Sequence, residues 1–192
     1  GEKLVSVADD GHAFVWHSAT GERLASLVVA TSSAPAELTS AASATTPTTN
    51  SPLPNSLNGP LTTVAFSPDG RFIVAAGERT PLIHVWDADT FAAHQTIGFG
   101  PADSLAFSPD GALLATAGND GCLRVYEWNV TGTWTEKVAI QAHQDFARKV
   151  VWSPGGTSLA TAGSDCSVKI WDTSSWAKLA EFAADDAVHA LA

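Results

Sequence analysis

The chain has 192 residues, 45% hydrophobic and 16% charged, which is enough apolar material for one folded domain. Twenty acidic and ten basic side chains give a net charge of −10, and no cluster of Lys or Arg occurs, so a surface that binds nucleic acid is not expected. The longest apolar run, 27–30, is far too short to span a bilayer and no signal peptide opens the chain, which argues against a membrane partner.

The first 60 residues divide into a β-prone part and a low-complexity part. Short apolar runs at 4–8, 13–17 and 23–29 predict three strands. Residues 30–60 hold five of the ten prolines and a single charged residue, Glu37. Such a segment buries too little apolar area to offset its ordering entropy, so we expect a disordered insertion. A docking or phosphorylation segment is the alternative interpretation, suggested by Thr46-Pro47 and Ser51-Pro52.

The remainder of the chain contains three copies of one unit. Its first strand and turn read VAFSPDG at 64–70, LAFSPDG at 105–111 and VVWSPGG at 150–156. Each turn glycine is followed by another glycine seven residues later, at Gly77, Gly118 and Gly163. The units end in an aromatic residue with a polar neighbour: Trp86-Asp87, Tyr126-Glu127 and Trp171-Asp172, with Trp16-His17 closing an earlier copy.

These turns, offsets and terminal pairs resemble the WD40 repeat family, whose fold is a β-propeller of four-stranded blades. The resemblance implies an all-β fold with about four antiparallel blades. A first blade, 1–29, lacks its first strand, and the insertion 30–60 follows it. Blades at 61–100, 101–143 and 144–184 come next, and 185–192 forms the first strand of a further blade or a closing strand.

Because the sequence begins inside a hairpin and ends within a strand, we expect it to be an excerpt of a larger ring. Residues 78–98 also resemble propellers of echinoderm-type microtubule-associated proteins and of kinase-signalling scaffolds.

The resemblance also implies a hydrogen-bonded group inside each blade, formed by a His, a Ser or Thr, an Asp and a Trp. Only the last blade has all four. The first blade keeps three of them, and the third keeps two, with Tyr126 in place of the Trp. The second blade has Ala75 in place of the hydroxyl residue, so we expect no such group there. The complete group is His143, Thr161, Asp165 and Trp171, and the partial groups are Ser6, Asp10 and Trp16, and Thr116, Asp120 and Tyr126.

A His, an Asp and a Thr close together also suggest hydrolysis, but we interpret the group as structural. Its hydroxyl and carboxyl residues recur at the same four-residue offset in three blades, whereas a catalytic site is normally built once. The histidines form no HxH or HExxH pair, and the Asp-Gly turns lack the alternating carboxylates of a calcium loop, so we expect no metal and no cofactor.

Two classes of function remain. The resemblance implies a non-catalytic scaffold that binds proteins or peptides through its rim loops. A ligand-binding or hydrolytic propeller enzyme is the alternative. The candidate partner-binding residues are Arg79, in an inner hairpin, and Phe146 and Arg148, which flank the start of a strand. A solvated charge or a ring packed between blades is the other reading of each.

The cysteines and the apolar end faces predict the cellular location and the self-association of the protein. Cys122 and Cys166 lie at non-equivalent positions and read as free thiols of an intracellular protein, so we expect a cytoplasmic location, with the nucleus as a second possibility. An isolated set of four blades leaves apolar end faces, so we also expect self-association.

Overall fold

Fifteen β-strands make up the regular structure of the described part of the chain. The computed structural model describes residues 2–28, 60–77, 79, 82–98 and 100–191. Within these ranges every regular element is a strand. No helix of a length and hydropathy suited to crossing a bilayer is found among the residues described.

The strands form four antiparallel sheets, each built from strands consecutive in the chain. The first has three strands in the described residues: β1 (Lys3–Val7), β2 (His12–His17) and β3 (Arg23–Val28). The second has four: β4 (Thr63–Phe66), β5 (Phe72–Ala76), β6 (Ile83–Asp87) and β7 (Ala93–Ile97). The third has β8 (Ser104–Phe107), β9 (Leu113–Ala117), β10 (Cys122–Trp128) and β11 (Trp134–Gln141). The fourth has β12 (Ala147–Trp152), β13 (Ser158–Gly163), β14 (Ser167–Asp172) and β15 (Lys178–Ala183).

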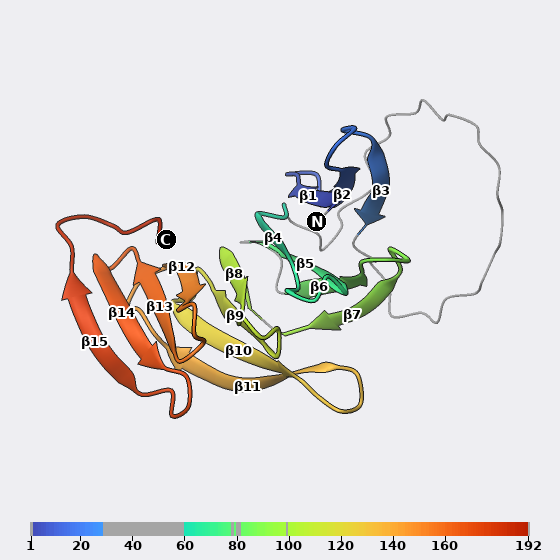
Figure 1. The fold of residues 1–192 in the computed structure, drawn as a ribbon. Helices are drawn as coiled ribbons and strands as arrows, with labels where there is room; N and C mark the ends of the chain where they lie inside the picture. Colours follow the sequence, from blue (N-terminus) through green and yellow to red (C-terminus); the bar gives the residue numbers. More distant parts are fainter. Residues whose placement is uncertain (1, 29–59, 78, 80–81, 99, 192) are drawn as a thin grey trace.

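The sheets follow one another along an arc that is open on one side (Figure 1). The first strands β4, β8 and β12 lie on the inner side of the arc, and the last strands β3, β7, β11 and β15 lie on its outer side. Each sheet therefore meets its neighbours through its faces, as the blades of a propeller do.

The core is divided between the three junctions of consecutive sheets. One cluster joins the first two sheets, with Val15 and Leu27 packed near Ile73 and Trp86. A second joins the middle sheets and includes the aromatic side chains of Phe72, Tyr126 and Trp134. The third joins the last two and includes Leu123, Val125, Leu159 and Trp171. Each sheet is thus stabilised by its immediate neighbours.

The repeated turn also connects neighbouring sheets. Gly70, Gly111 and Gly156 have φ between 71° and 74°, a left-handed conformation that glycine adopts without steric cost. A Cβ on Gly111 would lie 3.4 Å from Cδ of Pro68, the proline of the preceding turn. A Cβ on Gly156 would lie 3.6 Å from the ring of Pro109. The turns of the third and fourth sheets therefore each rest on the turn of the sheet before.

The glycine seven residues later marks a close approach of two chain segments. A Cβ on Gly77 would lie 1.9 Å from the carbonyl oxygen of Pro60, and one on Gly118 would lie 1.8 Å from that of Pro101. In the fourth sheet the neighbour changes, because a Cβ on Gly163 would lie 2.4 Å from Nδ1 of His143. Only glycine fits at the three positions.

The structure confirms an all-β fold of propeller-type sheets, with three four-stranded sheets and one of three strands in the described residues. The insertion 30–60 falls almost entirely outside those residues. The described residues 184–191 form no strand, and the strand expected within 185–192 stays a prediction. The Val188 amide still donates to the Gly163 carbonyl, 3.2 Å away, but no second strand lies beside the segment to complete a ladder.

Candidate functional site

The fourth sheet holds the only complete group among the residues described. Asp165 Oδ1 lies 2.9 Å from His143 Nδ1, and Thr161 Oγ1 lies 2.8 Å from His143 Nε2. Trp171 Nε1 donates to Thr161 Oγ1 at 3.0 Å. An ionised carboxylate only accepts, so Nδ1 carries the proton and the Thr161 hydroxyl donates to Nε2. One neutral imidazole thus links the turn, the second strand and the third strand.

The surroundings of this group favour a neutral histidine beside an ionised aspartate. Burial is the main factor that lowers the pKa of His143 below its ordinary value. Burial alone would raise the pKa of Asp165, but hydrogen bonds from Ser167, His143 and the Gln144 amide together lower it well below its ordinary value. Lys169 Nζ lies 3.6 Å from Asp165 Oδ2 and donates to the Ala142 carbonyl at 2.6 Å.

Burial also decides what this group can do chemically. His143 is 1% exposed and Thr161 is 0% exposed. A substrate cannot reach a hydroxyl with no accessible surface, and each polar atom is already bound to another member of the group. The arrangement holds strands together and offers no nucleophile to a ligand.

The partial groups keep some of these contacts. In the first sheet Trp16 Nε1 donates to Ser6 Oγ at 2.9 Å, while Asp10 accepts the His12 amide at 3.0 Å. In the third sheet Tyr126 is hydrogen-bonded to Thr116. Without a histidine, Asp120 instead accepts from Arg124 Nη2 at 2.6 Å.

Phe146 and Arg148 lie together at the start of β12 and form, with two neighbours, what we call the rim site: Asp103, Phe146, Arg148 and Ser164. The Arg148 guanidinium lies 4.6 Å from the centre of the Phe146 ring. Arg148 Nη1 lies 2.9 Å from Asp103 Oδ2 of the third sheet, and its Nε donates to Ser164 Oγ of the fourth at 3.1 Å. Phe146 remains 40% exposed, so a fixed cation supports an accessible aromatic ring.

Arg79, the third predicted residue, lies elsewhere. It is exposed in the connection between β5 and β6, and its neighbours Thr80 and Pro81 fall outside the described residues. No ion pair of Arg79 occurs among the salt bridges of the described residues. The structure therefore does not bring Arg79 together with the other two residues.

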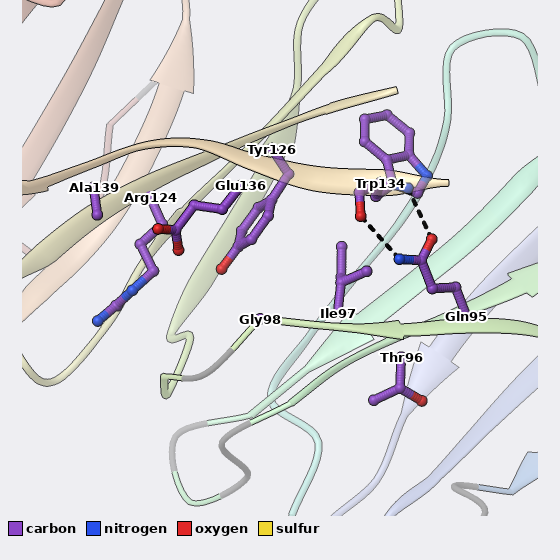
Figure 2. Close-up of a pocket in the computed structure, with 9 residues that line it drawn as sticks. All are labelled: Gln95, Thr96, Ile97, Gly98, Arg124, Tyr126, Trp134, Glu136 and Ala139. Atoms are coloured by element: carbon purple, nitrogen blue, oxygen red, sulfur yellow. Dashed lines mark hydrogen bonds between the residues drawn. The ribbon is translucent and has the colours of Figure 1, made fainter. Parts of the chain in front are cut away.

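A pocket of ≈ 640 Å³ lies between β7 of the second sheet and β10 and β11 of the third (Figure 2). Gln95 closes one end, because its side-chain amide donates to the Trp134 carbonyl and accepts from the Trp134 amide, both at 2.8 Å. The Tyr126 hydroxyl would lie 2.5 Å from a Cβ on Gly98, so glycine is required where the chain passes it. The residues that line the pocket are Gln95, Thr96, Ile97, Gly98, Arg124, Tyr126, Trp134, Glu136 and Ala139.

The pocket offers binding groups but little chemistry. Burial raises the pKa of Tyr126 to about 12, so its phenol stays protonated near neutral pH. The cation of Arg124 is already paired with Asp120. Among the described residues, no group of three or more His, Cys, Asp or Glu side chains is arranged to hold a metal ion.

Sequence reasoning missed two cations of the interior. Lys169 follows Asp165 by four residues, and Arg124 follows Asp120 by the same offset. Each aspartate lies in the turn before a third strand, and the cation on that strand lies close to it. The shared offset was the available signal. Sequence reasoning also missed Asp103, which can be paired with Arg148 only once the two sheets are placed side by side.

The comparisons with known proteins agree with this geometry. The model of the WD40 family, described as "WD domain, G-beta repeat", matches the chain in three places, at residues 52–87, 89–127 and 134–172. Together these stretches make up more than half of the chain. Each matched stretch ends at or directly beside the aromatic residue of a sheet's third strand. None of the proteins with curated descriptions matches the chain.

Proposed function

Because the chain belongs to the WD40 repeat family, we propose that it is a non-catalytic scaffold that binds a partner protein through the rim site. WD40 repeats are generally protein-interaction scaffolds, and the family is typically non-enzymatic. The burial of Thr161 and His143 supports a non-catalytic role, since the residues that most resemble catalytic ones are closed to substrate.

The accessible ring of Phe146 carries this proposal. An exposed aromatic side chain normally loses conformational freedom when a partner binds, which weakens association. Here the guanidinium of Arg148 already lies over the ring, and contacts from two sheets fix that guanidinium. Aromatic and Arg side chains held in this way are the residue types that contribute most to protein interfaces. We infer a partner segment that places an apolar side chain on Phe146.

Arg79 has a secondary part in the proposal. It is exposed in a connection between strands, which is where propeller proteins present variable residues on a rigid scaffold. We propose that Arg79 contacts an acidic part of the same partner and contributes less than the rim site, because exposed charge pairs typically add at most about 1 kcal/mol.

A peptide-display experiment tests this function. Random peptides selected on the purified chain are assayed by fluorescence anisotropy against Phe146→Ala and Arg148→Ala. We expect each variant to raise the dissociation constant at least about tenfold. Val130→Ala is the matched control, because Val130 is also an exposed hydrophobic residue but lies in the β10–β11 hairpin, and it should leave binding unchanged. Equal affinity for all variants would show that partners bind elsewhere.

A further inference from the structure

The pocket between the second and third sheets has two walls of different chemistry (Figure 2). The second sheet contributes Ile97, which is 5% exposed, and Gly98, which has no side chain. The third sheet contributes the functional groups of Arg124, Tyr126 and Glu136. Sites for small ligands typically have volumes of about 300–1,000 Å³, and this pocket falls within that range. It is therefore large enough for a long side chain with the backbone next to it.

The register of the third sheet directs Glu136 into the pocket. Glu136 is paired with Tyr126 across β10 and β11, and Ala139 is paired with Arg124. Residues paired across two antiparallel strands present their side chains on the same face of the sheet. The charge of Glu136 lies close enough to the phenol to add to the effect of burial in raising the pKa of Tyr126. The carboxylate thus belongs to the same surface as the phenol and the guanidinium.

The charges of the pocket do not balance. Arg124 is neutralised by Asp120, whose Oδ2 lies 2.6 Å from Arg124 Nη2. On the other side of the guanidinium, a Cβ on Gly100 would lie 2.7 Å from Nη1, so the chain covers that side as well. Glu136 takes part in none of the ion pairs of the described residues. One negative charge therefore remains at the pocket, and the net charge of −10 strengthens the attraction of a cation.

We propose that this pocket binds an arginine side chain of the partner protein, so the inference rests on the proposed function for the existence of that partner. The guanidinium of that arginine pairs with the Glu136 carboxylate, because the planar fork of N–H groups matches the two carboxylate oxygens. Its aliphatic stem packs on Ile97 and Ala139, which keep water away from the pair. An ammonium group has no planar pair of donors, so lysine fits this site less well.

The pocket and the rim site lie close enough for one partner segment to reach both. Gly98 of the pocket and Asp103 of the rim site belong to the same connection, between β7 and β8. Their Cα atoms are at most about 18 Å apart, because five residues of extended chain span no more than that. A partner segment that places an apolar side chain on Phe146 therefore carries its arginine within about eight residues of that side chain.

Titration of the 192-residue chain with N-acetylarginine amide, followed by amide NMR, tests the pocket without any partner. We expect shifts at the residues that line the pocket, and a dissociation constant that rises at least about fivefold in Glu136→Gln and with the uncharged N-acetylcitrulline amide. Glu22→Gln is the matched control, because it removes the same charge from an exposed glutamate between β2 and β3, and it should leave binding unchanged. The proposal is overturned by absence of binding, or by equal affinity of wild type and Glu136→Gln.

Peptide selection on three forms of the chain separates the pocket from the rim site. Peptides selected on the wild type should carry an arginine within about eight residues of an apolar side chain. Peptides selected on Glu136→Gln should lose the arginine and keep the apolar residue, and those selected on Phe146→Ala should show the reverse. Arginine that stays enriched on Glu136→Gln would overturn the pocket alone. Apolar residues that stay enriched on Phe146→Ala would overturn the rim site alone.

Discussion

The residue two places before the aromatic of each third strand differs from sheet to sheet: Phe14, His84, Arg124 and Lys169. Arg124 and Lys169 lie beside the turn aspartates. His84 has no acidic partner among the ion pairs of the described residues, and its ring centre lies 5.8 Å from that of Trp86. Burial lowers the pKa of His84 to about 4. His84 is thus a neutral side chain in an apolar junction.

This position makes the stability of the chain sensitive to acid. The folded pKa of His84 lies below the unfolded value of about 6.5, so its contribution is complete above that pH and is lost as the pH falls toward 4. Between pH 7 and pH 5 we expect the free energy of unfolding to fall by about 1–2 kcal/mol through His84. The variant His84→Phe places at this position the residue type of Phe14. Its free energy of unfolding should fall by about 1–2 kcal/mol less than that of the wild type over the same pH change. Urea unfolding at the two pH values measures the difference.

His189→Gln is the control for this prediction, because His189 is exposed. It should leave the pH dependence of the wild-type chain unchanged. The same loss of stability in wild type and His84→Phe would mean that His84 is protonated in the folded state at pH 5.

The structural group shows how far residue-level prediction extends. His143, Thr161, Asp165 and Trp171 could be selected from sequence because each occupies a fixed offset in a repeated unit, and the structure places them within hydrogen-bond distance. The pairing of Arg124 with Asp120 was missed, although it repeats the four-residue offset of Lys169 from Asp165.

At the scale of single elements, three turns hold a side chain in a conformation that favours glycine. Phe91, Cys166 and Trp176 have φ between 58° and 60°. Cys166 occupies the position of Gly11 and Gly121 in the turns that follow β1 and β9, where φ is 79° and 74°. A left-handed conformation costs a residue with a side chain about 1–2 kcal/mol.

Relief of this strain gives a prediction for the β13–β14 turn. Cys166→Gly should raise the free energy of unfolding by about 0.5–1 kcal/mol, because the strain removed exceeds the added freedom of the unfolded chain. Chemical denaturation measures the change. The reverse substitution, Gly121→Cys, should destabilise, since its Cβ would lie 2.5 Å from the His143 carbonyl oxygen. Loss of stability in Cys166→Gly would show that the thiol's contacts outweigh the strain.

Element boundaries were predictable wherever the turn chemistry was distinctive. The expected strands at 4–8, 13–17 and 23–29 lie within one residue of β1, β2 and β3 at each end. The strand expected near 188 stays a prediction, because the described residues 184–191 form no strand. A strand exists only beside a second strand, and the described chain provides no such partner there.

At the scale of the whole molecule, the sheets form a series in which each contacts its neighbours. Sequence repeats predicted this series, because each unit carries the same apolar positions for the sheet before and the sheet after. They did not predict that the Arg148–Asp103 ion pair links the third and fourth sheets, since neither residue recurs in the other units. Three separate core clusters indicate that stability is distributed junction by junction.

This distribution predicts that a cavity at one junction weakens mainly the sheets that share it. Leu159→Ala, at the junction of the last two sheets, should cost about 2–5 kcal/mol locally and reduce amide hydrogen-exchange protection from β8 to β15 more than in β1–β3. Leu27→Ala, at the junction of the first two sheets, should produce the opposite gradient. Hydrogen exchange read by mass spectrometry resolves the two patterns. Uniform loss of protection in both variants would mean that the four sheets unfold as one cooperative unit, and that the contacts between neighbours are strong enough to carry a local defect along the whole arc.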